Sequence, residues 1–292
     1  MAKAYPSKPI NSFHNAKNMK TGKRRPVERF IAFLLGVFFF VLLWWLLSLW
    51  MEGEGLHYLP DPWRIFGRVG ELLFQSGALK TYAAFGYTFL KMLIGFAFSF
   101  LLAGMLGTIG ALFPLFASFE KSHILLFRSV PTAGIALLLG TAFWLELPSW
   151  HPFIPSILTF LVAFPILYQA FLDGIVSIPS EEKDALRLDG AERKMKTVYS
   201  IYWPDASGYI GLGLSQAFGL SFKVTIMSEI VTNSGTSKME GIGTLIGKAI
   251  QENADLNLAI AYSLIAVLAV FLADGLLLLT KSVLKAKTLK GD

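Results

Sequence analysis

The chain has 292 residues, of which 54% are hydrophobic, 14% aromatic and only 16% charged. Soluble domains carry roughly 25% charged residues, so this composition excludes an ordinary soluble globule and predicts an all-α integral membrane protein. The absence of cysteine excludes disulfides and cysteine metal sites. The formal net charge of +6 does not indicate nucleic-acid binding, because most basic residues lie in the tails and in one polar loop beside apolar runs.

Residues 1–29 are polar and basic and contain three prolines, which predicts a flexible cytoplasmic tail. Residues 30–50 form an apolar run long enough to span a bilayer, with three tryptophans towards its outer end, where an aromatic belt is expected. The run is too long for the core of a signal peptide and no small-residue cleavage site follows it, so we expect no cleavage.

Residues 51–80 are predicted to lie outside the membrane and to include a short amphipathic surface helix at 62–74. Glycines recur along the next apolar run, and small residues let helices approach closely in lipid. Arg128 lies near the predicted cytoplasmic start of the third span, and Pro131 lies inside that span. The second, third and fourth spans are predicted at 82–113, 124–145 and 152–173, with a short cytoplasmic connection at 114–123.

Residues 181–205, EEKDALRLDGAERKMKTVYSIYWPD, are the most polar run between the first span and the C-terminal tail, and we name them the polar segment. Its five basic residues favour the cytoplasmic side. Acidic residues followed by basic ones predict a short helix at 181–188, which Gly190 ends. A second helical run is predicted at 192–202, ended by Pro204. The apolar face of that run would comprise Met195, Val198, Tyr199 and Tyr202.

Two short amphipathic helices joined at a glycine would suit docking into a cleft on another protein. An ordinary solvated loop has a similar composition, and composition alone leaves both interpretations open.

The last two spans are predicted at 208–230 and 255–280, separated by an extracytoplasmic loop with a short helix at about 241–251. Of the 26 Lys and Arg residues, 19 fall in segments predicted to be cytoplasmic, 5 in extracytoplasmic ones and two within spans. This asymmetry places both termini in the cytoplasm. The predicted organisation is a basic tail (1–29), a six-span domain (30–284) and a second tail (285–292).

Four ionisable residues fall within or at the end of predicted spans: Lys91, Lys223, Glu229 and Asp274. A charge at mid-bilayer costs about 2.5–3.5 kcal/mol on insertion scales, so each needs a reason. One interpretation is a path for a polar or anionic solute; the alternatives are snorkelling to the interface and structural pairing between helices. The candidates for such a path or its gating are Lys223, Lys91, Arg128 and Pro131.

The sequence contains no recognisable motif for catalysis, metal binding or nucleotide binding. The four histidines are scattered without metal-ligand spacing, no P-loop occurs, and no serine lies in a nucleophile elbow. We therefore predict a chain without catalytic residues, metal or cofactor of its own.

The polar segment resembles the EAA loop of the membrane-spanning permease subunits of bacterial ABC importers. The resemblance rests on Asp184-Ala185-Leu186, three further residues, Gly190, and a proline after an aromatic-rich run. Asp184 stands where the family usually has Glu, and Leu186 where it has a second Ala. The resemblance implies a coupling helix in a groove of the cytoplasmic ATPase, with Asp184, Ala185, Leu186, Gly190 and Ala191 as coupling residues.

Further stretches resemble the branch of these permeases that imports taurine, alkanesulfonates and nitrate. The likeness implies structural roles for Glu229, before the outer loop, and for Asp274, in the last span. Residues 143–153 depart from the branch pattern. The similar stretches are LPDPWRIF (59–66), YTFLKMLIGF (87–96), FRSVPTAGIALLLG (127–140) and GIGTLIGKAIQENADLNLAIAY (241–262).

The resemblance implies a type I importer permease in a prokaryotic cell membrane. The chain would form a homodimer around the path, with ATPase subunits that bind ATP and Mg below it and a solute-binding protein above it. A stand-alone secondary transporter or channel is the alternative, but we find neither an inverted repeat nor a run of intramembrane carboxylates. A membrane-embedded enzyme would need clustered polar residues at one interface, and a structural protein would leave the polar segment unexplained.

Overall fold

The computed structural model describes residues 26–56, 58–75, 77–129, 131–147, 149–232 and 239–288, with the side chains of 26, 27, 29, 144, 273, 274 and 276–288 excepted. Within these ranges the chain is helical and contains no strand. It divides into two units, residues 1–62 and 63–292, which are described separately.

The first unit contains one long helix, α1 (Pro26–Gly53). Its stretch Phe30–Gly53 is long and apolar enough to cross a membrane, and most of its large side chains are exposed, as in a helix that faces lipid. After the helix the chain turns back, and the indole Nε1 of Trp44 donates a hydrogen bond to the carbonyl of Pro60 at 3.1 Å. The predicted first span is therefore present as a helix.

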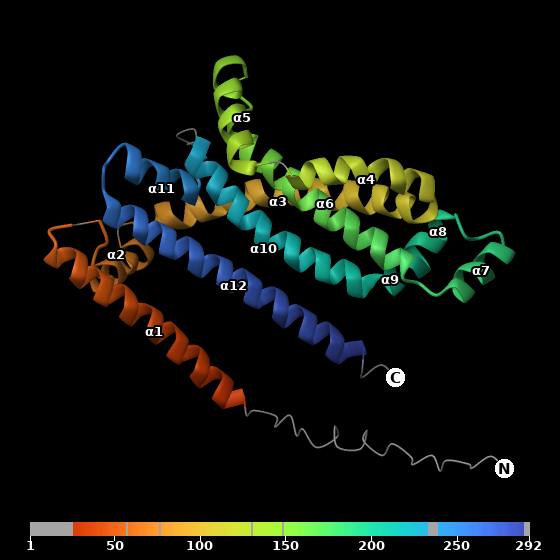
Figure 1. Ribbon diagram of the computed structural model, residues 1–292, viewed down its shortest axis with the longest axis horizontal. Helices are drawn as coiled ribbons and strands as arrows, with labels where there is room; N and C mark the ends of the chain where they lie inside the picture. The colour runs from red at the N-terminus through yellow and green to blue at the C-terminus, as the bar shows by residue number, and fades with distance from the viewer. Residues whose placement is uncertain are drawn as a thin grey trace, which may run out of the picture. The chain divides into compact units, whose positions relative to one another are not determined.

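Three long helices form the centre of the second unit: α3 (Ala78–Leu112), α6 (Ile154–Val176) and α10 (Ser207–Thr232). They run side by side (Figure 1). Their contacts depend on small residues, because a Cβ on Gly107 would lie only 2.8 Å from the Cβ of Phe171. The predicted role of glycine in close helix approach is thus confirmed on α3.

The predicted surface helix is α2 (Pro62–Phe74), which begins at a proline, a residue favoured in the first helical turn. Its buried residues Ile65, Val69 and Leu72 follow one another at spacings of four and three, so they share one helix face. The amphipathic helix expected at 62–74 is confirmed.

The short helix expected in the outer loop is α11 (Ile242–Gln251), which precedes α12 (Leu256–Thr288). α11 contacts both α10 and α12 and is buried along most of its length. Figure 1 places α11 at one end of α10 and the polar segment at the other.

The third predicted span, 124–145, is not one continuous helix: the chain forms two helices with a sharp bend between them, and only the two together pass as a candidate span. Helix α4 (Pro114–Ser129) occupies the predicted short connection and folds back against α3, and α5 (Thr132–Glu146) then departs at an angle of 83°. Pro131 lies at the break. Proline lacks an N–H donor and disfavours a helical conformation in the residue before it, so a helix breaks there.

Four described helices are long and apolar enough to cross a membrane, and the bent pair α4 and α5 would make a fifth. The sixth predicted span coincides with α12, whose described apolar part is Leu256–Leu272. A multi-pass architecture is therefore supported, and the count of six stays a prediction. The short helix η2 (His151–Phe153) leads into α6.

Candidate coupling surface and membrane path

The first half of the polar segment is helix α7 (Ser180–Leu188), and none of its residues is buried. Glu181 and Glu182 lie in its first turn and Arg187 in its last, which suits the helix dipole. Asp184 and Ala185 are exposed, and only Leu186 packs partly against the core of the unit. The helix predicted at 181–188 is confirmed as a projecting element.

A Schellman motif ends α7. The Ala191 N–H donates to the Leu186 carbonyl at 2.8 Å and the Gly190 N–H donates to the Arg187 carbonyl at 3.0 Å. Gly190 adopts a φ of +63°, a conformation that glycine reaches without a steric penalty. A Cβ added at this position would have no atom within 4 Å, so the backbone angle rather than space selects glycine here.

The guanidinium of Arg187 closes the turn on its exposed side. It donates from Nη2 to Glu192 Oε1 at 2.9 Å and from Nε to Glu192 Oε2 at 3.2 Å, and it also reaches Asp184. The hydrogen bonds from Arg187 lower the pKa of the Glu192 carboxyl below its ordinary value. Sequence reasoning missed this fork, because residues five apart on either side of a glycine turn have no fixed relation.

The second half of the polar segment is one helical run of three parts: α8 (Met195–Thr197), a π-helical turn η3 (Val198–Tyr202) and α9 (Trp203–Asp205). Two expectations for this run are wrong. Pro204 does not end the helix; the widened turn before it, in which the Trp203 N–H bonds to the Val198 carbonyl, accommodates the proline without a lost i−4 bond.

The apolar face of this run is also split. Val198 and Tyr202 are buried as expected, but Met195 and Tyr199 are 64% and 56% exposed. Val198 and Tyr202 therefore lie on one side of the run and Met195 and Tyr199 on another, and only the first pair packs against the core.

The run fixes the turn to the membrane helices. The Tyr202 hydroxyl donates to the Glu192 carbonyl at 3.0 Å, and the Thr197 hydroxyl donates to the Ala191 carbonyl at 2.7 Å. Next along the chain, the indole Nε1 of Trp203 donates to the Thr108 hydroxyl of α3 at 3.1 Å. Its ring packs against Phe171 of α6, with centroids 5.2 Å apart. The turn is therefore joined to α3 and α6 by these side-chain contacts.

A buried polar cluster lies at the other end of the unit. Lys91 of α3 and Glu229 of α10 form an ion pair with a distance of 2.9 Å between Nζ and Oε1, and they are 1% and 0% exposed. Thr88 donates to the second carboxylate oxygen, Oε2, at 2.8 Å. The backbone N–H of Gly243 donates to the same oxygen at 3.0 Å.

The cluster also holds the backbone of the outer loop. The Lys91 ammonium donates to the Met239 carbonyl at 3.0 Å, and the Ile242 N–H donates to the Thr88 hydroxyl at 2.8 Å. A Cβ on Gly241 would overlap the Glu229 carboxylate, so the glycine allows the loop to pass close to the ion pair. This arrangement satisfies a buried charge pair with several hydrogen bonds, as low-dielectric surroundings require.

The structure separates the remaining candidates from this cluster. Arg128 is exposed in the last turn of α4, about 21 Å along the helix from Pro114. Pro131 lies at the N-terminus of α5. Lys223 is exposed on α10 and lines a groove of about 500 Å³ beside α12. The side chain of Asp274 lies outside the described residues.

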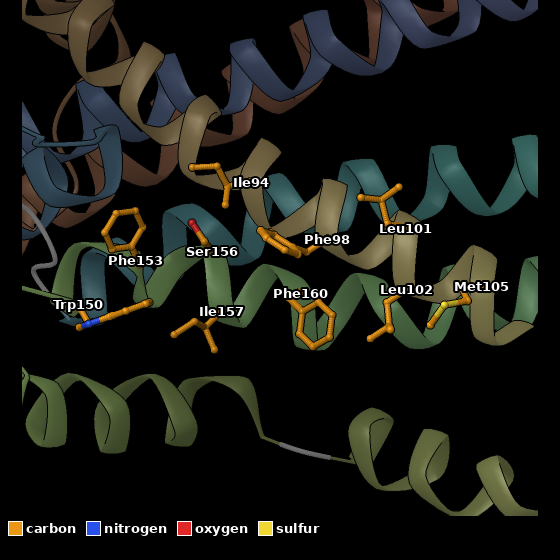
Figure 2. Close-up of a pocket in the computed structure, with 11 residues that line it drawn as sticks. Ile94, Phe98, Leu101, Leu102, Met105, Trp150, Phe153, Ser156, Ile157 and Phe160 are labelled. Atoms are coloured by element: carbon orange, nitrogen blue, oxygen red, sulfur yellow. The ribbon is translucent and has the colours of Figure 1, made fainter.

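An apolar groove of about 640 Å³ runs between α3 and α6, and sequence reasoning did not single it out (Figure 2). Phe98 and Leu101 of α3 line it together with Phe160 of α6. Its lining also includes Ser156, whose hydroxyl donates to the Lys91 carbonyl at 2.7 Å. Among the described residues, no group of three His, Asp or Glu side chains could hold a metal ion.

Residues 103–281 match the protein family described as the binding-protein-dependent transport system inner membrane component. This match covers more than half of the chain. The chain belongs to this family. The matched region of the inner membrane component begins within α3 and includes the polar segment, Lys223 and Glu229; Lys91 and α1 precede it. No curated protein sequence matches the chain.

Membership confirms the resemblance at the level of the family. The chain is a multi-pass inner membrane component, the permease part of an ABC-type transport system that works with a binding protein. Members of this family are transport subunits rather than enzymes. The match does not distinguish the taurine and nitrate branch from other branches.

Proposed function

We propose that this permease couples to a cytoplasmic ATPase through α7 and carries a small polar solute that an extracytoplasmic binding protein delivers. Both termini are cytoplasmic, and the chain forms a homodimer with the path between its copies. ATP and Mg bind to the ATPase, and this chain holds no cofactor. The solute is a sulfonate, taurine, nitrate or a similar small organic compound such as a vitamin precursor.

The observation that carries the proposal is the construction of the polar segment. It presents a helix without a buried residue on a turn that Gly190 permits, and it links that turn to α3 and α6 through Trp203. An ordinary solvated loop needs no such link.

Asp184, Ala185, Leu186, Gly190 and Ala191 act in this proposal as the coupling residues. When ATP closes the ATPase dimer, α7 moves with it, and the Trp203 contacts pass the movement to the membrane helices. The Lys91–Glu229 pair has a different part: it holds the outer loop against α3 and α10, so the far end of the unit moves as a rigid body.

Affinity purification of the tagged chain from its own membranes in mild detergent tests the proposal. We expect a stoichiometric ATPase subunit to remain bound, and we expect a variant with α7 deleted to lose it while staying in the membrane. If the chain purifies alone and carries solute in liposomes without ATP, it is a secondary transporter and the proposal fails.

A further inference from the structure

Lys223 is the feature of the membrane helices that the coupling mechanism does not use. It lies nine residues before the end of α10 at Thr232 and sixteen after its start at Ser207, which is about 14 Å and 24 Å along the axis. The hydrocarbon core of a bilayer is about 30 Å thick, so this position on a spanning helix falls within it. A lysine there is costly, and intramembrane ionisable residues mark solute pathways.

The lysine lines the groove between α10 and α12. The walls are apolar: Met227 and Ile230 come from α10, and Val267 and Phe271 from α12. Ser263 is the other polar side chain of the lining, and its hydroxyl already donates to the Ala259 carbonyl at 2.8 Å. Among the described lining residues, the ammonium group is therefore the single charge in a groove of about 500 Å³.

The two deep lysines differ in their surroundings. Lys91 is buried against Glu229, whereas Lys223 forms no hydrogen bond or ion pair with any side chain that the structure describes. A cation in an apolar groove, with no described carboxylate beside it, is complementary to an anion that arrives from elsewhere.

From this charge complementarity, and resting on the proposed function, we infer that the transported solute is a small organic monoanion whose acidic group binds Lys223. Its apolar part lies against Met227 and Phe271. Carboxylates and sulfonates share this chemistry. The headgroup of an anionic phospholipid shares it too, so the experiment must separate the two sources.

The test uses the intact chain in nanodiscs of phosphatidylcholine and measures binding of 1-hexanesulfonate by calorimetry. We expect Lys223→Met to weaken binding about tenfold or more, because a hydrogen-bonded charge contact is lost. Lys223→Arg keeps the charge and should stay within about threefold of the wild type. The neutral isostere hexanesulfonamide should bind equally to all variants, and Lys80→Met, which removes an exposed lysine at the start of α3, should change nothing.

Equal binding of hexanesulfonate to wild type and Lys223→Met would overturn the inference. It would also be overturned if phosphatidylglycerol in the discs abolished sulfonate binding, because Lys223 would then hold a lipid headgroup. If Lys223→Met lowered the stability of the protein and the double variant Lys223→Met/Asp274→Asn regained it, the lysine would belong to a structural ion pair with Asp274 instead. Binding is measured without the ATPase, so failure to recover an ATPase subunit would sink the proposed function and leave this result standing.

Discussion

Glu229 illustrates how single residues of this permease are constrained by what surrounds them. Its carboxylate is fully buried and accepts bonds from an ammonium, a hydroxyl and a backbone N–H, which come from α3 and from α11. Buried charges tolerate such positions only when they are paired and hydrogen-bonded. The pair therefore serves to hold the outer loop in one position.

Breaking this pair on one side should destabilise the protein strongly. We expect Lys91→Met to lower the free energy of unfolding by about 3–5 kcal/mol, because the Glu229 carboxylate is left uncompensated. The double variant Lys91→Met/Glu229→Gln should recover part of the loss. Thermal unfolding of the wild type, the two single variants Lys91→Met and Glu229→Gln, and the double variant in one detergent gives the coupling energy of the pair. Strictly additive losses of stability would show that the two side chains do not interact.

Gly190 is constrained by its backbone angle. Gly190→Val should strain the turn by about 1–2 kcal/mol, since a β-branched residue is disfavoured at positive φ. We expect ATP-driven uptake to fall while the amount of protein in the membrane stays unchanged. Gly190→Asn is the matched control, because Asn adopts this conformation more readily. If Gly190→Val and Gly190→Asn gave equal uptake, the backbone conformation at this turn would not matter for coupling.

At the scale of the elements, the polar segment is joined to the membrane helices by α9. The Trp203 indole bonds to Thr108 on α3 and its ring lies against Phe171 on α6, so one side chain touches both helices. A π turn precedes α9, and Met195 and Tyr199 of the same run are exposed.

Removal of the indole hydrogen bond tests this connection. Trp203→Phe should cost about 0.5–1.5 kcal/mol in stability and should reduce uptake per ATP hydrolysed. In the background of Thr108→Val, the further change Trp203→Phe should have little additional effect, because the partner hydroxyl is already gone. If the two substitutions reduced uptake independently, the bond would not be part of the coupling route.

Several elements are predictable from the sequence because their signals are local. The acidic start and glycine end of α7, the proline at the start of α2 and the apolar spacing of α11 each act within a few residues. The break between α4 and α5 is missed, although Pro131 is visible, because the long apolar run predicts a single span. A run of apolar residues indicates that a segment is hydrophobic, but it does not show whether the helix bends within the segment.

The candidate site is less predictable for a related reason. Lys91 and Glu229 are 138 residues apart, and no spacing rule joins them. The side of the 195–202 run that packs inward is set by its contacts with α3 and α6, so the helical period alone misassigns Met195 and Tyr199. Lys223 is recognisable only as a charge in a span, since the groove beside it is formed by another helix.

At the scale of the whole molecule, the two ends of the second unit are built differently. One end exposes α7, and the opposite end holds α11 and the Lys91–Glu229 pair (Figure 1). The long helices α3, α6 and α10 connect the two ends and pack closely through glycines. In the proposed mechanism, this rigid connection carries movement from the ATPase side to the side that receives the solute.

Cross-linking at α7 in the complete transporter tests the coupling role of this helix most directly. The chain contains no cysteine, so Leu188→Cys supplies its only thiol. With a cysteine-to-lysine cross-linker in native membranes, we predict a product that contains the ATPase and changes in yield when ATP binds. Leu79→Cys, similarly exposed at the start of α3, should give no such product. The coupling role of α7 would be contradicted if Leu188→Cys remained unlinked in membranes that transport normally.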